Sequence, residues 1–410
     1  MRVAVVAGPD PGHALPAIGV AAALARRGHD VVVHGGRQHA RTAAVHGVPT
    51  RALPVIERSG PPPRGFGERL YEVAVALTAP LVRTWRSDPP DVVVVDTLTR
   101  AGAFAAELCD RPWVELIAHH LPDPDVGLPP VGLGRPCART PWRRADDRRL
   151  VDRQQRSLAQ GRSEQRRAAA AVGLHEPTGP VVRLLATLPS LERPRACWPH
   201  DAHVVGALAV DPARPVLAPP DGSAPLVLVT DSTASETGGT LGALALTALH
   251  GCDLRTVVTS AQLPQRADGV VVVGQGPHGP LLAAADVVVC PGGGGLLSKA
   301  AAAGVPAVIV PRQGDQREAA ARWRDVGAAR VVSGHRISPR RLRWAIVRQL
   351  ADPDAARAAG RLAAEAAELG PDLAAQLVEA VAAGAAPQAT GPAHHLDAPR
   401  TRRPPTTTHG

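Results

Sequence analysis

The chain has 410 residues, of which 45% are apolar and only 2% aromatic, so Val, Leu and Ala must fill its hydrophobic cores. This length exceeds what a single core usually supports and predicts two domains. The net charge of +9 comes almost wholly from arginine, and residues 135–167 contain 11 arginines against 4 acidic residues. That stretch carries no recognisable nucleic-acid motif, so we expect a solvated helical face or a flexible linker and no nucleic-acid partner.

Nothing in the sequence indicates a membrane span, a disulfide framework or a metal site. No apolar run reaches the roughly 18–20 residues that cross a bilayer. The chain starts directly with strand-like residues rather than with a signal peptide. Its five cysteines are odd in number and unclustered. We therefore expect a cytoplasmic protein that binds no metal.

The first 210 residues alternate between apolar runs of strand length and helical segments. Strands are predicted at residues 2–7, 29–33, 91–96, 113–117, 181–185 and 203–205, and helices at residues 14–27, 100–109 and about 141–174. Residues 8–12 are expected to form a turn, and the Pro- and Gly-rich residues 121–140 a long loop. This alternation predicts a parallel sheet with helices on both faces in an N-terminal domain, residues 1–210.

A proline-dense stretch, residues 211–225, is expected to link this domain to a second strand–helix series. The second domain, residues 226–384, is predicted to start with strands at 226–230, 255–259 and 269–273 and a helix at 239–250. Residues 385–410 have the composition of a disordered tail. Because ligands bind at the carboxyl ends of parallel strands, two such domains in series predict a binding cleft between them.

Residues 286–316 are the most informative segment of the chain, with the sequence DVVVCPGGGGLLSKAAAAGVPAVIVPRQGDQ. The pattern predicts a buried strand at 286–290, a glycine turn at 292–295, a helix at 296–303, a strand at 305–310 and a polar loop with Asp315 and Gln316. A glycine turn before a helix N-terminus is an anion site, because free amides and the helix dipole point at the ligand. An ordinary strand-to-helix turn is the alternative.

Three segments, in chain order, carry the motifs of one enzyme family. They are PGHALPAIGVAAALARRGHDV near the N-terminus, DVVVVDTLTRAGAFAAELCDRPWVEL from Asp91, and the run from Leu281 to Gln316 with its GVP and closing Asp-Gln. With these motifs, roughly residues 1–350 resemble glycosyltransferase family 1, of the actinobacterial natural-product or UDP-glucuronosyl type. The resemblance implies an α/β GT-B fold, with two Rossmann-like doubly wound parallel-sheet domains facing a cleft, and a hexosyltransferase-type activity.

The same resemblance implies that an acceptor hydroxyl attacks the anomeric carbon of a nucleotide sugar in one inverting displacement. His13 occupies the position of the family's general base, and Asp96 matches the carboxylate that orients that base. Two alternatives stay open from the residues alone. His13 could be a helix residue with only local hydrogen bonds, and Asp96 could cap the helix of residues 100–109.

For the donor, the resemblance implies a nucleoside diphosphate held without a metal by backbone amides and hydroxyls. The candidate donor-binding residues are Ser232, Thr233, Pro291, Gly292, Gly293, Gly294, Gly295, Lys299, Asp315 and Gln316. Asp315 and Gln316 match the pair that contacts sugar hydroxyls, with a capped loop as the alternative. The acceptor is expected to be a hydrophobic small molecule, walled by residues 61–85 and 121–140.

The donor segment departs from the family pattern at several positions. Pro291 stands where the family has a histidine that touches the diphosphate, and Leu296 and Leu297 replace Ser or Thr. Lys299 replaces a glutamate that holds the ribose and could instead offer a cation to a phosphate, and Ala319 replaces an asparagine. Two other functions therefore remain in view: a catalytically impaired relative that acts as an auxiliary scaffold for another enzyme, and a nucleotide-sugar epimerase of the same fold.

Overall fold

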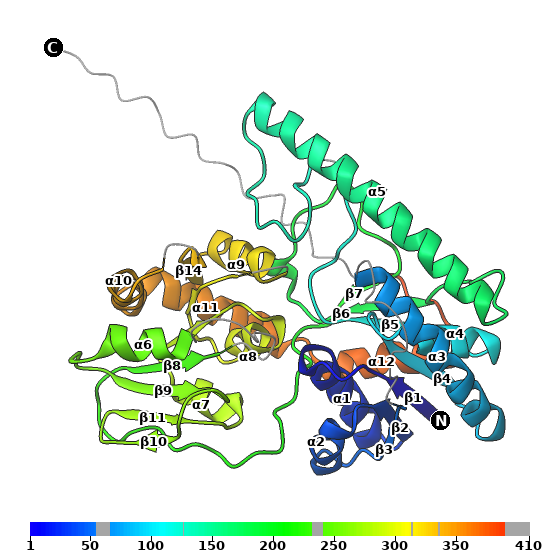
Figure 1. The fold of residues 1–410 in the computed structure, drawn as a ribbon, viewed down its shortest axis with the longest axis horizontal. Coiled ribbons are helices and arrows are strands. Elements are labelled where there is room, and N and C mark those ends of the chain that lie inside the picture. The colour runs from blue at the N-terminus through cyan, green and yellow to red at the C-terminus, as the bar shows by residue number, and fades with distance from the viewer. Residues whose placement is uncertain (55–65, 126, 232–240, 313–314, 335–336, 390–410) are drawn as a thin grey trace.

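The structure is a computed structural model that describes residues 1–54, 66–125, 127–231, 241–312, 315–334 and 337–389. Within these residues each half of the chain builds one sheet of seven strands, with helices packed against it (Figure 1). The predicted fold class, two Rossmann-like domains with mainly parallel sheets, is confirmed. The domain boundaries themselves remain a proposal.

The first sheet is parallel throughout and changes strand order beside β1. Its order is β3 (Thr50–Ala52), β2 (Asp30–Gly35), β1 (Arg2–Val6), β4 (Val92–Asp96), β5 (Trp113–Ile117), β6 (Val182–Leu185) and β7 (Ala202–Val204). The chain runs from β1 to β2 and β3 on one side, then to β4 on the other, so a topological switch point lies between β1 and β4. Ligands bind beyond the carboxyl ends of the strands at such a point.

Both faces of this sheet are buried, which explains the uninterrupted valine runs of its central strands. The helices of this half are α1 (Pro11–Arg26), α2 (Ala40–Val45), α3 (Phe66–Ser87), α4 (Ala101–Leu108) and α5 (Pro141–Ala171), with short 3₁₀ turns at Arg37–His39 and Pro189–Leu191. The arginine-rich stretch is confirmed as mainly helix α5, which lies along the outer side of the domain (Figure 1). Nine of its arginines, from Arg143 to Arg167, are exposed, as expected for a solvated face.

Helix α1 begins three residues before its predicted start. Asp10 is the N-cap, because its Oδ1 accepts a hydrogen bond from the Gly12 amide at 2.8 Å, and Pro11 occupies the first helical position. The predicted turn at residues 8–12 overlooked this cap, since Gly12 reads as a helix breaker. His13 consequently lies in the first turn of α1, shortly after β1 ends.

The second sheet repeats the arrangement, with its switch point between β8 and β12. Its order is β10 (Arg266–Ala267), β11 (Val271–Gly274), β9 (Arg255–Thr259), β8 (Leu226–Thr230), β12 (Val287–Cys290), β13 (Ala307–Ile309) and β14 (Ala329–Val331), and only the β10–β11 pair is antiparallel. Its helices are α6 (Leu241–Leu249), α7 (His278–Ala284), α8 (Gly294–Ala302), α9 (Asp315–Asp325), α10 (Pro339–Leu350) and α11 (Pro353–Ala367).

Helix α9 corrects the prediction of a polar loop around Asp315 and Gln316. Both residues lie in the first turn of the helix, which buries Glu318 and Arg322 together with Trp323. Since charged side chains occupy its inner face, no apolar period marks this helix in the sequence.

The last described helix, α12 (Pro371–Ala382), returns to the first domain (Figure 1). Its apolar residues join the core on the α1 face of the first sheet. Glu379 accepts hydrogen bonds from Arg27 at 2.7 Å and from His29 at 2.6 Å, which ties α12 to the end of α1. The predicted second domain, residues 226–384, therefore includes a helix that packs on the first sheet.

Candidate active site

His13 and Asp96 meet at the switch point of the first sheet. The Nδ1 atom of His13 lies 2.5 Å from Oδ1 of Asp96, the last residue of β4. The other carboxylate oxygen accepts hydrogen bonds from the Leu98 amide at 3.2 Å and the Thr99 hydroxyl at 3.0 Å. Arg100, not Asp96, is the N-cap of α4. The Asp96 side chain is fully buried, so His13 has a rigid partner 83 residues away in the chain.

This contact fixes which ring nitrogen of His13 carries the proton. Because a carboxylate only accepts, Nδ1–H donates to Asp96 and Nε2 keeps the lone pair of the neutral ring. Burial alone would lower the pKa of His13, but the hydrogen bond and the charge of Asp96, helped by Asp10 and Asp315, raise it above 6.5. The side chain is 16% exposed. The imidazole can therefore take a proton at Nε2 from a bound hydroxyl.

The glycine turn forms the opposing wall of the site. Gly292 has a φ of 98°, a conformation that favours glycine, and a Cβ there would lie 2.9 Å from the Ile309 side chain. Gly293 is the N-cap of α8, and Gly294 and Gly295 form its first turn. Pro291 is buried behind them.

The first turn of α8 faces the first domain. A Cβ added to Gly294 would lie 3.1 Å from the carbonyl oxygen of Ala118, which follows β5. Among the described residues, the amides of Gly294, Gly295 and Leu296 take part in no hydrogen bond. Three free amides at the positive end of a helix dipole can bind an anion.

Lys299 lies in α8 and forms an ion pair with Asp211. Its ammonium group donates to Asp211 Oδ1 at 2.7 Å and to the Val210 carbonyl at 2.8 Å, at the start of the predicted linker. Asp211 also accepts from the amides of His278 and Gly279 at the start of α7. Burial lowers the pKa of Lys299, and the Asp211 charge only partly offsets this. The ammonium thus binds the predicted linker, whereas the sequence analysis considered it as a cation for a phosphate.

Asp315 and Gln316 lie at the start of α9, beside the glycine turn. The side-chain oxygen Oε1 of Gln316 accepts a hydrogen bond from the Arg312 backbone amide at 3.1 Å, and the backbone oxygen of Gln316 lies 3.3 Å from where a Gly292 Cβ would be. The Asp315 carboxylate is close enough to contribute to the raised pKa of His13. Ser232 and Thr233, the candidate hydroxyl donors, lie outside the described residues.

A cavity of about 40 Å³ lies where these elements converge. It is lined by Ala118, His119, His120, Ala186, Thr187, Leu188, Leu191, Ala207, Gly294, Leu297, Ser298, Ala301, Asp315, Ala319 and Trp323. Ligand pockets usually measure about 300–1,000 Å³, so this cavity is smaller than a typical ligand pocket. His119 and His120 were missed by the sequence analysis. The available signal was a histidine pair directly after a buried strand that neighbours the strand of Asp96.

A buried ion cluster joins the two domains beside this cavity. We use "interdomain ion cluster" for His120, Glu192, Arg193, Glu318 and Arg322. Arg322 donates to Glu192 at 2.9 Å and to Glu318 at 2.9 Å, Arg193 donates to Glu318 at 3.1 Å, and His120 Nδ1 donates to Glu192 at 3.0 Å.

The cluster also holds part of the predicted 121–140 loop. Glu318 accepts hydrogen bonds from the amides of Gly132 and Gly134. Burial would raise the pKa of Glu192, but His120 and Arg322 hold it below its usual range. Both carboxylates of the cluster therefore stay ionised, and the cluster links α9, with Asp315 and Gln316, to the first domain.

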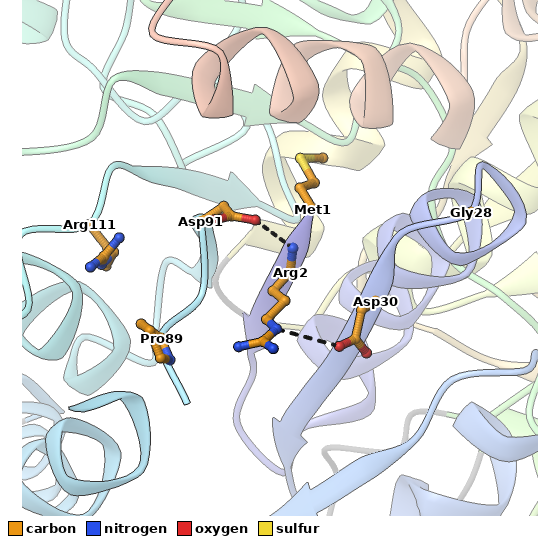
Figure 2. A pocket seen from close by; sticks show the side chains of 7 residues that line it. All are labelled: Met1, Arg2, Gly28, Asp30, Pro89, Asp91 and Arg111. Carbon is orange, nitrogen blue, oxygen red and sulfur yellow. Dashed lines mark hydrogen bonds and ion pairs between the residues drawn. The ribbon is translucent and has the colours of Figure 1, made fainter. Parts of the chain in front are cut away.

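A larger hollow of about 410 Å³ lies at the opposite end of the first sheet (Figure 2). It is lined by Met1, Arg2, Gly28, Asp30, Pro89, Asp91 and Arg111. Here the backbone amide of Arg2 donates to Asp91 at 2.7 Å, and the guanidinium of Arg2 lies 4.0 Å from Asp30. These residues surround the amino ends of β1, β2 and β4, whereas ligands of parallel sheets bind at the carboxyl ends. The hollow is therefore not our candidate site.

The described residues contain neither a helix suited to span a membrane nor a cluster of metal-ligating side chains. No described helix combines the length and apolarity needed to cross a bilayer. The described residues also contain no group of three His, Cys, Asp or Glu side chains placed to hold a metal ion.

Comparison with known proteins defines the class. Residues 245–381 match the family model of the erythromycin biosynthesis protein CIII-like C-terminal domain. The chain is 28% identical to 4'-demethylrebeccamycin synthase of Lentzea aerocolonigenes over 390 residues, which span 86% of this chain and 92% of that protein. Two Rossmann-like domains with a cavity between them are the arrangement of the GT-B fold.

Solved structures agree with this assignment of the fold. The glycotransferase of kitacinnamycin superimposes with a TM-score of 0.70 at 21% identity, covering 92% of this chain and 98% of that one. The glycosyltransferase VinC, in complex with DTDP, gives 0.68 at 22% identity, covering 94% and 100%. Residues 245–381 thus carry a glycosyltransferase family 1 signature, and the chain is similar to actinobacterial natural-product glycosyltransferases.

Proposed function

We propose that the chain is an inverting glycosyltransferase that moves a sugar from a nucleoside-diphosphate sugar to a hydroxyl of a hydrophobic small molecule. The observation that carries this proposal is the His13–Asp96 pair, because the His13 ring lies 6.5 Å from the ring of His119, which lines the interdomain cavity together with Gly294. A base and an anion site on opposing walls are what a single displacement at an anomeric carbon requires.

In the proposed reaction, Nε2 of His13 takes the proton of the acceptor hydroxyl as the oxygen attacks the anomeric carbon. The new carbon–oxygen bond forms while the bond to the diphosphate breaks, so the configuration at that carbon inverts. Asp96 keeps Nδ1 protonated and stabilises the imidazolium that results. The proton later leaves to solvent, which returns His13 to its neutral form.

The donor is proposed to lie against the second domain. The amides of Gly293, Gly294 and Gly295 would receive the diphosphate at the positive end of α8. Asp315 and Gln316 would bind sugar hydroxyls, and Ser232 and Thr233 would add hydroxyl donors. The structure of the relative VinC with DTDP supports thymidine diphosphate as the first nucleotide to test.

Three further candidate residues have structural roles in the proposed donor site. Pro291 and Gly292 set the backbone path of the turn that precedes α8. Lys299 holds the linker at Asp211, at a distance from the phosphates. The acceptor would lie over the first domain, between the region of α3 and the loop of residues 121–140.

Thermal unfolding with and without nucleotide separates the enzyme from an auxiliary scaffold. At a concentration of 100 times Kd, thymidine or uridine diphosphate should stabilise the folded state by about 2.7 kcal/mol. For domains of this size that corresponds to a rise in Tm of about 5–11 °C. Absence of any shift with either nucleotide at millimolar concentration would favour the scaffold and count against donor binding.

The pH profile of transfer should report the ionisation of His13. Only the neutral imidazole can accept the acceptor's proton, so kcat/KM should fall as the pH drops through a pKa above 6.5. In Asp96→Asn the carboxylate no longer raises the pKa of His13, whereas burial still lowers it. The acidic limb of the profile should therefore move to lower pH, and the rate of transfer should drop. An acidic limb that stays in place in this variant would assign the ionisation to another group.

A further inference from the structure

The loop after β5 carries a histidine that the proposed mechanism does not use. His119 lines the interdomain cavity, and its ring lies 6.5 Å from the ring of His13, centroid to centroid, with an edge-on angle of 75°. Its Nδ1 lies 2.8 Å from the carbonyl oxygen of His120. Since a carbonyl only accepts, Nδ1–H must donate, and Nε2 is the nitrogen left for a ligand.

The same loop is in close contact with the anion site. The carbonyl of Ala118, the residue before His119, lies 3.1 Å from where a Gly294 Cβ would be. Glycine at that position therefore lets the first turn of α8 approach the loop. Gly294, His119 and Asp315 line one cavity, so the imidazole and the free amides of α8 belong to one site.

On its own side of the cavity, α8 offers amides but no side-chain donor to an anion. Leu296 and Leu297 are apolar, and Pro291 has neither an imidazole nor an amide proton. The Ser298 hydroxyl donates to the Gly295 carbonyl at 3.1 Å, and Lys299 is paired with Asp211. Any cationic group near a diphosphate at this turn would therefore have to come from an element other than α8.

We propose that His119 is this partner and binds the leaving diphosphate of the donor through Nε2–H. With Nδ1–H already donated to His120, a proton on Nε2 makes the ring an imidazolium, which brings positive charge to a phosphate oxygen. The proton comes from solvent, and no covalent bond changes. This inference rests on the proposed function and adds a binding residue for the leaving group, taken from the first domain.

Two substitutions at one position separate the binding role from a structural one. In His119→Asn the side-chain amide can still donate to the His120 carbonyl, but nothing reaches the position of Nε2. In His119→Gln the amide reaches that position without a charge. Losing a charge-assisted hydrogen bond should weaken binding of thymidine diphosphate roughly ten- to a hundredfold in His119→Asn, and less in His119→Gln.

The measurement is titration calorimetry of the full-length chain with thymidine and uridine diphosphate. Thymidine without phosphate, followed by ligand-observed NMR, should bind equally well to wild type and both variants. His175→Ala, at an exposed histidine beyond α5, serves as the matched control and should bind like wild type. Circular dichroism melting confirms that each variant is folded.

The outcomes distinguish this inference from the function on which it rests. Unchanged diphosphate affinity in His119→Asn, or an equal loss for thymidine and thymidine diphosphate, would overturn the role of His119 and leave the proposed function standing. If wild type bound neither nucleotide, the proposed function would fail first. A loss confined to the diphosphates supports the inference.

Discussion

The substitution His13→Ala should lower kcat by about 10²- to 10⁴-fold, the usual contribution of a positioned general base. The imidazole lies at the switch point of the first sheet, 2.5 Å from the buried carboxylate of Asp96. Without it, the acceptor hydroxyl must lose its proton to water. The fold should survive, since His13 lies on the first turn of α1 and the Asp10 cap of that helix remains.

Initial rates of nucleoside-diphosphate release, measured with a hydroxylated aromatic acceptor, test this prediction. His175→Ala is again the control and should retain wild-type turnover. Thymidine diphosphate should bind the His13→Ala variant about as well as wild type, because the lost step concerns the acceptor. Turnover within a few-fold of wild type would show that another group is the base.

The substitution Arg322→Met should have the largest effect on stability, about 3–5 kcal/mol. The Arg322 side chain is 2% exposed and lies between Glu192 and Glu318, which are 0% and 3% exposed. Methionine fills a similar volume but removes one ion pair from each of the two buried carboxylates. Their desolvation is then offset only by His120 and Arg193, and α9 loses one of its ion pairs to the first domain.

Chemical denaturation followed by circular dichroism measures this effect, and Arg324→Met provides the matched control on the same helix. Arg324 is 43% exposed and pairs only with its neighbour Asp325, so its loss should cost less than about 1 kcal/mol. Equal stability of the two variants would mean that the interdomain ion cluster does not hold the domains together.

Much of the fold was accessible from the sequence because parallel strands buried on both faces leave long apolar runs. The valine runs of β1, β4, β8 and β12 were each predicted within about one residue of their observed ends. His13 and Asp96 could be placed together for a related reason, since both follow strands that the resemblance identifies.

The structural features that could not be predicted from the sequence depend on contacts between residues far apart in the chain. Helix α9 looks like a loop because Glu318 and Arg322 face inward, where partners from the first domain neutralise them. The return of α12 to the first sheet has no local signal, and neither does the Lys299–Asp211 pair, whose members are 88 residues apart. His119 was overlooked because its nearness to His13 depends on strand order, although a histidine pair after a buried strand was visible in the sequence.

The structure explains in physical terms how the donor segment, residues 286–316, differs from the family pattern. Pro291, Leu296 and Leu297 have no polar side chain, so the start of α8 offers an anion only backbone amides. Lys299 is paired with Asp211 in the linker. The facing loop brings His119 to the same cavity. The site is thus proposed to be shared between the domains, so that its assembly depends on how closely they approach.

The stereochemistry of transfer tests the central claim most directly. The chain would be incubated with an α-linked thymidine- or uridine-diphosphate sugar and a hydroxylated aromatic acceptor, and the product's anomeric proton examined by NMR. A single displacement with His13 as base predicts a β-linked product whose formation is lost in His13→Ala. An α-linked product, or the same product formed at an unchanged rate by His13→Ala, would contradict the account.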